Sequence, residues 1–231
     1  GLLFFSLPVT LAYGAKSYLD LDEITLRLTP AIFGIALIAA ALLFRRLIGN
    51  TGMVVAALLT AISPMHVFFS RYYIMELPMV LMLAAFVFFI WKYFSQPKTR
   101  WMLCAGTMAA FMHATKETFV ISIMALVAAA IIIWLIEEIS SRKAARLEIL
   151  PLIRHVTLGV ILCVFISGAL YSVLFTNLGA IPQSYSTYLH YLDRAEGSGH
   201  EKPFLYYARL LAWKKMELYT WSEILILSLG A

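Results

Sequence analysis

Long apolar segments follow one another along almost the whole chain, and they constrain its fold more than any other feature. A helix that crosses a bilayer needs about 20 mostly apolar residues. Six segments come near that length: 28–44, 52–69, 74–94, 101–115, 118–136 and 155–178. Hydrophobic residues make up 62% of the chain and charged residues 13%, whereas soluble domains are about half apolar and about a quarter charged. The sequence therefore predicts an all-α, polytopic transmembrane helix bundle.

Composition divides this single transmembrane module into four regions. We interpret residues 1–25 as an interfacial segment, because a proline, a glycine and a lysine interrupt its apolar run. Residues 26–178 hold the membrane spans, 179–217 form an outer loop with an interfacial helix, and 218–231 begin a seventh span. The chain opens without a methionine and stops inside an apolar run, so we expect the module to be truncated at both ends.

Three short connections between the spans carry half of the basic residues. The stretches around Arg45–Arg46, Lys92–Arg100 and Arg142–Arg154 hold nine of the 18 basic residues but only three of the 13 acids. Because Lys and Arg in short loops favour the cytoplasmic side, these connections are predicted to be cytoplasmic. The other ionisable residues, above all those of 179–217, then gather on the outer face.

Charge and cysteine content exclude several kinds of site. The net charge of +5 is explained by the cytoplasmic connections, so no nucleic-acid partner is expected. Cys104 and Cys163 lie inside apolar runs, where cysteine packs as a small hydrophobic residue. No Cys/His cluster has the spacing of a zinc site, and no glycine-rich phosphate-binding loop is present. The sequence therefore offers no metal or cofactor site.

A pair of charges at membrane depth forms the first candidate site. Arg71 and Glu76 lie five residues apart, flanked by apolar residues. A charge at the centre of a membrane helix costs about 2.5–3.5 kcal/mol, so it is kept where it is paired or lines a watery cavity. Arg71 suits a phosphate through forked hydrogen bonds, and Glu76 suits a proton or a sugar hydroxyl. Alternatively, the two residues pair with each other or reach the interface.

Two further polar elements are predicted on the same outer face. Lys116–Glu117 splits a long apolar stretch, either as a functional pair or as the polar turn that two neighbouring spans need. The outer loop carries His200 and Lys202, followed by Tyr206 and Tyr207, which suit a membrane interface. The remaining histidines are interpreted as incidental; they are His66, His113, His155 and His190.

The order of these elements resembles the polytopic GT-C glycosyltransferases, in the clan of the dolichyl-phosphate-mannose protein mannosyltransferases and aminoarabinose transferases. Four stretches carry the resemblance: an arginine–leucine motif leading into an early span (Asp22–Gly34), a serine–proline to serine–arginine and acid pattern (Ser63–Glu76), a lysine after a span (Lys116–Glu117) and an outer-loop element (His200–Tyr207). Within the clan, the chain most resembles an archaeal and bacterial subfamily associated with flippase activity.

The resemblance implies inverting transfer of a sugar from a polyprenyl-phosphate donor to an acceptor protein or glycolipid, outside an archaeal or bacterial plasma membrane. In such a reaction a carboxylate takes the proton of the acceptor, and basic groups stabilise the leaving phosphate. Glu76 would bind a sugar hydroxyl or orient Arg71. The residues that the resemblance assigns to substrate binding are Arg71, Lys116, Glu117, His200, Lys202 and Tyr206.

The catalytic acid is expected to lie upstream of this chain. The clan carries its acceptor-activating Asp-Glu pair in a long outer loop after a first span, whereas only 21 residues precede Asp22 here. Asp22 and Glu23 are the fallback pair, and Glu76 is the candidate among the spans.

Two other functions stay open at this point. The chain is alternatively a non-catalytic component of the flipping or transport of lipid-linked sugars, which broken helix pairs in corresponding halves would favour. We see no such pair in the sequence. The last alternative is a structural membrane subunit, in which the charged pairs are turn residues.

Overall fold

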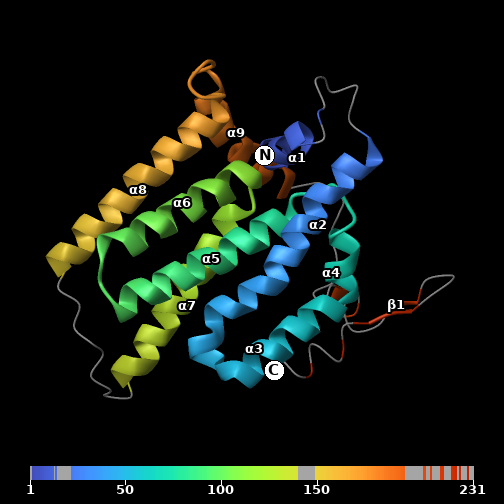
Figure 1. Cartoon of the computed structure of the whole chain (residues 1–231). Helices are drawn as coiled ribbons and strands as arrows, with labels where there is room; N and C mark the ends of the chain where they lie inside the picture. The colour runs from blue at the N-terminus through green and yellow to red at the C-terminus, as the bar shows by residue number, and fades with distance from the viewer. Residues whose placement is uncertain are drawn as a thin grey trace. The chain divides into compact units, whose positions relative to one another are not determined.

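A computed structural model of the chain describes residues 2–12, 14, 22–139 and 149–195, together with short pieces beyond: 205–206, 209, 214–215, 220–222, 224 and 228. Most of these residues are helical (Figure 1). The elements are α1 (Leu2–Ala12), α2 (Glu23–Ala40), the 3-10 turn η2 (Ala41–Phe44), α3 (Arg45–Ile62), α4 (Pro64–Phe69), α5 (Glu76–Ser95), α6 (Thr99–Thr115), α7 (Phe119–Ile139), α8 (Ile149–Tyr171), α9 (Ala180–Ala195), β1 (Lys214–Lys215) and β2 (Thr220–Trp221). The all-α prediction is confirmed, and the two-residue strands are a minor addition.

Three helical stretches of the described chain are long and apolar enough to cross a membrane. They are Glu23–Ile62, Glu76–Ser95 and Ile149–Tyr171. Phe119–Ile133 is a shorter apolar stretch of α7. Many large apolar side chains on these helices are exposed, such as Ile161 at 59% and Phe165 at 61% on α8. Apolar surface on this scale is typical of a protein that lies in lipid.

The span expected over 52–69 is broken in the structure. Helix α3 ends at Ile62, and α4 begins at Pro64. The Ser63 hydroxyl accepts a hydrogen bond from the His66 backbone N–H at 3.2 Å, and proline at the first helical position needs no backbone donor. The serine–proline motif is therefore the start of a new short helix.

The span expected over 155–178 lies further toward the N-terminus. Helix α8 begins at Ile149 and ends at Tyr171. The Ser172 hydroxyl donates to the Gly168 carbonyl at 2.6 Å and accepts from the Phe175 N–H at 2.9 Å. Because these bonds satisfy backbone groups that a continuing helix would use, the chain turns after Tyr171.

The seventh expected span, from about 219, also differs from the structure at its start. Thr220–Trp221 form strand β2, which pairs antiparallel with β1 so that Lys214 lies opposite Trp221. Within this strand pair the backbone groups bond across strands rather than along a helix. Much of the rest of this segment lies outside the described residues.

The chain divides into two units. Unit 1 runs from Pro78 to Tyr188, and unit 2 comprises Leu2–Leu77 with the described pieces after Tyr188. In unit 2, η2 and the start of α3 turn the chain between α2 and α3. The turn uses Gly49, whose φ of 74° few other residues adopt readily.

Unit 1 is organised around the contact between α6 and α8. A Cβ atom on Gly106 would overlap the Gly159 carbonyl oxygen, and a Cβ on Gly159 would come within 2.9 Å of the Met102 carbonyl oxygen. The two backbones therefore touch directly, which small residues permit in membrane proteins. Helix α5 runs antiparallel to both helices, and its Tyr93 is bonded to His155 near the start of α8 at 3.1 Å.

We predict that Gly106→Ala weakens the packing of α6 against α8, because the added methyl group has no space. Overpacking of this kind costs about 1–3 kcal/mol. The thermal unfolding midpoint of the full-length protein in detergent should fall. Gly168→Ala is the matched control, since the nearest atom to its new Cβ is Ile181 Cδ1 at 3.9 Å. Equal midpoints for the two variants would contradict the close approach.

Candidate functional site

The Lys116–Glu117 turn lies at one end of unit 1. Lys116 ends α6 with extended backbone angles, and its N–H donates to the Met112 carbonyl at 3.2 Å. The Phe119 N–H then donates to the Lys116 carbonyl at 3.1 Å as α7 begins. Lys116 and Glu117 are both half-buried. The two residues therefore form the tight turn between helices that the sequence allowed, in a partly enclosed position.

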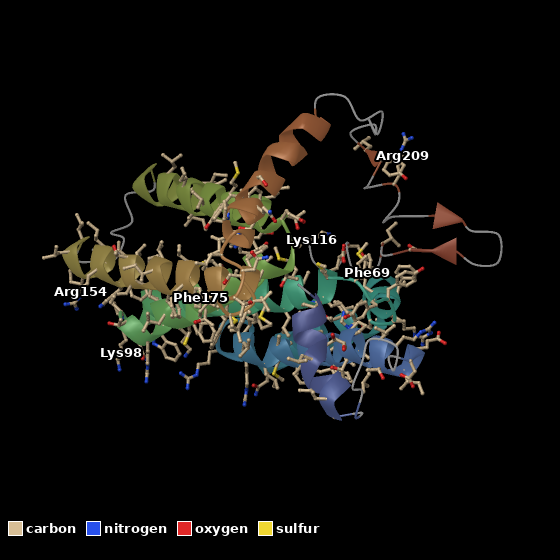
Figure 2. The ribbon with its side chains drawn as sticks, turned by 90° about the horizontal axis from the view of Figure 1, so that it is seen from above. Phe69, Lys98, Lys116, Arg154, Phe175 and Arg209 are labelled. Carbon is tan, nitrogen blue, oxygen red and sulfur yellow. The ribbon has the colours of Figure 1, made fainter. Side chains whose placement is uncertain are left out.

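The opposite end of unit 1 carries basic side chains. Lys98 lies between α5 and α6, and Arg154 lies near the start of α8. Figure 2 shows both at one end of the unit and Lys116 toward the other. This separation agrees with the predicted split between basic connections and outer polar residues. Which end faces the cytoplasm stays a prediction.

A cluster of aromatic rings surrounds His113, one helical turn before Lys116. The ring centroid of His113 lies 5.0 Å from that of Tyr171, 5.4 Å from Phe119, 5.8 Å from Tyr185 and 6.0 Å from Tyr188. The Tyr171 hydroxyl donates to the His113 carbonyl at 2.9 Å. Helix α9 is therefore held against the ends of α6 and α8 by its tyrosines, at the same end of unit 1 as Lys116–Glu117.

Tyr188 is kept neutral in this cluster. Burial raises the pKa of its phenol, and the negative charges of an ionised Tyr171 and of Glu117 raise it further. Its hydroxyl oxygen is buried and has no hydrogen-bond partner among the described residues. A neutral phenol is a hydrogen-bond donor. Tyr188 can therefore donate to a polar group that enters beside Glu117, but it cannot act as a base.

A cavity of about 220 Å³ lies between α8 and α9 beside His113. Its polar side chains are those of His113, Ser167, Tyr171, Ser184 and Tyr185, and the rest of its lining is apolar. Small-molecule sites in proteins have this mixture of a mostly apolar wall and a few polar groups. The cavity thus gives this end of unit 1 a partly enclosed space beside the Lys116–Glu117 turn.

In unit 2, Asp22 and Glu23 are both engaged in local contacts. The Asp22 carboxylate accepts from the Thr25 backbone N–H at 2.7 Å and from the Thr25 hydroxyl at 2.6 Å, which caps α2. The hydrogen bond from the Thr25 hydroxyl, followed by that from its backbone, lowers the pKa of Asp22. Glu23 forms an ion pair with Arg27 one turn along the helix. These contacts give both acids a structural role at the start of α2.

Arg71 and Glu76 lie on the connection between α4 and α5. The Arg71 N–H donates to the Phe68 carbonyl at 3.1 Å, and Arg71 is exposed. Glu76 is the first residue of α5 and is half-buried. The Tyr73 hydroxyl between them donates to the Ser6 hydroxyl of α1 at 3.0 Å. This contact ties the connection to α1 within unit 2.

The predicted site residues are thus divided between the two units. Lys116 and Glu117 belong to unit 1, while Asp22, Glu23, Arg71, Glu76 and the exposed Tyr206 belong to unit 2. His200 and Lys202 lie outside the described residues. Among the residues that the structure describes, no group of three or more His, Cys, Asp and Glu side chains is placed to hold a metal ion.

Sequence reasoning missed His113 and its tyrosines. His113 was interpreted as incidental, yet it is buried, at 6% exposure, in the centre of the cluster. The available signal was spacing: His113 lies three and four residues before Lys116 and Glu117, which places it one helical turn away. Tyr171 carries no such signal, because only the packing of α8 brings it to α6.

Comparison with known protein families gives one match for this chain. The chain matches the family described as dolichyl-phosphate-mannose-protein mannosyltransferase over residues 12–171. No curated protein and no solved structure matches it. The matched range includes α2 to α8 and the Lys116–Glu117 turn, and it covers well over half of the 231 residues. The chain therefore belongs to the dolichyl-phosphate-mannose-protein mannosyltransferase family, whose members are integral membrane glycosyltransferases.

Proposed function

We propose that the chain is part of a glycosyltransferase that moves a sugar from a polyprenyl-phosphate donor to a protein or glycolipid acceptor. The reaction takes place on the non-cytoplasmic face of an archaeal or bacterial plasma membrane, and the protein belongs to the flippase-associated subfamily. The observation that carries this proposal is the family match over residues 12–171, which includes most of the candidate residues. The apolar helices supply the bilayer setting that a lipid-linked donor needs.

The reaction breaks the bond between the sugar C1 atom and the phosphate oxygen and forms a bond from C1 to the acceptor oxygen. The bonding electron pair leaves with the polyprenyl phosphate, and the acceptor's proton goes to a carboxylate base. Negative charge therefore grows on the phosphate. Fixed cations placed there stabilise the transition state more than the ground state, and we assign this role to Arg71 and Lys116.

Local chemistry supports the assignment of the remaining groups. Asp22 is engaged by Thr25 and Glu23 by Arg27, so we assign the catalytic acid to a position upstream of this chain. In the partly enclosed turn, Glu117 beside Lys116 suits a sugar hydroxyl, and the neutral Tyr188 adds a donor. Glu76 binds a sugar hydroxyl or orients Arg71. From the family resemblance we assign His200 and Lys202 to the entrance for the donor, with Tyr206 packing against it.

We predict that Arg71→Ala in the full-length protein lowers sugar transfer by about 100-fold or more, as expected when a charge-stabilising group is lost from a transition state. The measurement is transfer of radiolabelled sugar from polyprenyl phosphate in membranes. Arg46→Ala is the matched control, because Arg46 is an exposed arginine at the α2–α3 turn of the same unit. Normal transfer by Arg71→Ala would remove Arg71 from the site.

We also predict the side of the membrane on which each candidate lies. With Cys104 and Cys163 replaced by alanine, an impermeant maleimide applied to intact cells should label Arg71→Cys, Lys116→Cys and His200→Cys. Lys98→Cys should be labelled only after permeabilisation, because it lies at the opposite end of unit 1 from Lys116. Labelling of Arg71→Cys and Lys116→Cys from opposite sides would exclude a common site.

A further inference from the structure

The basic end of unit 1 holds cations against aromatic rings. The Lys92 Nζ atom lies 5.0 Å from the ring centroid of Trp91 and 5.9 Å from that of Trp101. The Arg100 guanidinium carbon lies 4.5 Å from the Trp101 centroid. Cation–π contacts of this kind hold the two charges beside one indole ring. Lys92 from the end of α5 and Arg100 from the start of α6 therefore share one location.

Arg154 is tethered to the same end by a hydrogen-bond chain. Its Nη2 atom lies 3.4 Å from His155 Nε2, and His155 Nδ1 lies 3.1 Å from the Tyr93 hydroxyl. A guanidinium can only donate, so Nε2 is the acceptor and Nδ1 carries the proton that is donated to Tyr93. Tyr93 packs in one cluster with Trp101 of α6 and Leu152 of α8, so Arg154 lies at the same end of unit 1 as Lys92 and Arg100.

The basic end of unit 1 combines these cations with a buried indole N–H. The Trp101 indole Nε1 atom is buried and has no hydrogen-bond partner among the described residues. A buried donor without an acceptor destabilises the folded state. Both the charges and this N–H therefore favour an anionic acceptor.

Exposed apolar side chains border the cations. Phe94 is 58% exposed beside Lys92, and Ile149, Leu150 and Ile153 at the start of α8 are 72%, 79% and 56% exposed. A soluble anion would gain nothing from these side chains. A molecule with an anionic head and long apolar chains would cover them and bind the cations at the same time.

We propose that Lys92, Arg100 and Arg154 bind the phosphate of an anionic phospholipid at the end of unit 1 opposite the candidate sugar-transfer site. The phosphate oxygens accept from the three cations. They also accept from Trp101 Nε1–H once the cations move off the ring toward the phosphate. The acyl chains lie along the exposed apolar surface of α5 and α8. The bound lipid clamps the starts of α6 and α8 together, which stabilises their contact.

The test uses the full-length protein in phosphatidylcholine nanodiscs, with or without phosphatidylglycerol. Phosphatidylglycerol should raise the thermal midpoint, and native mass spectrometry after detergent release should show it bound in preference to phosphatidylcholine. Arg100→Gln and Arg154→Gln should each weaken phosphatidylglycerol binding by about tenfold, since each removes a charged hydrogen bond. Trp101→Phe leaves a smaller aromatic ring at this position and removes the indole N–H, and it should also weaken binding. Arg46→Gln makes the same charge change in unit 2 and should leave binding unchanged.

The outcomes separate this site from general attraction to a charged membrane. Equal weakening by Arg46→Gln, or equal binding of the two lipids, would overturn the proposal. Stabilisation by inorganic phosphate alone, to the same extent as by phosphatidylglycerol, would also overturn it, because the apolar surface would then play no part. Loss of binding in Arg154→Gln with normal unfolding in phosphatidylcholine would support it, since the protein is then folded and only the lipid contact is lost.

Discussion

Unit 1 depends on the direct contact between the backbones of α6 and α8. Gly106 and Gly159 leave no side chain between the helices, so that the Gly159 carbonyl occupies the space a methyl group on Gly106 would need. Inside a bilayer the hydrophobic effect contributes little to helix association, and helices associate instead through close packing of small residues. The contact brings the end of α8 to the end of α6, where the Tyr171 hydroxyl donates to the His113 carbonyl. At the other end of unit 1, Tyr93 of α5 is bonded to His155 of α8.

The two ends of unit 1 have different chemistry. At one end, the Lys116–Glu117 turn lies beside a ring cluster, a neutral phenol and a cavity. At the other, cations lie on tryptophan rings next to exposed apolar side chains. A protein that acts on a lipid-linked sugar has to hold its reactive groups at a defined depth in the bilayer. Anchoring one end to lipid headgroups would place the other end, and with it Lys116, at the opposite surface.

Much of the helical framework could be predicted because it depends on local properties. Apolar length located α5 and α6 to within a few residues, and Gln96–Pro97 marked the turn between them. The break inside 52–69 was missed because Ser63–Pro64 was interpreted only as part of a motif, although serine followed by proline is also a helix start. The role of Asp22 as a cap was equally local, since Thr25 lies three residues later. The ring cluster could not be predicted, because His113 and Tyr171 are 58 residues apart and meet only through packing.

The amino-acid sequence by itself determined that the chain is a membrane-embedded helical protein. The alternation of apolar runs with basic connections also predicted which connections between the helices face the cytoplasm. Unpaired backbone groups and charges have a high free energy in lipid, and each segment avoids this cost through its own residues, without help from other segments. Tertiary structure alone decided which helices touch, that the α9 tyrosines contact His113, and that His155 of α8 contacts both Arg154 and Tyr93 of α5. Those contacts depend on where helix backbones can approach each other, and that depends on residues far apart in the chain.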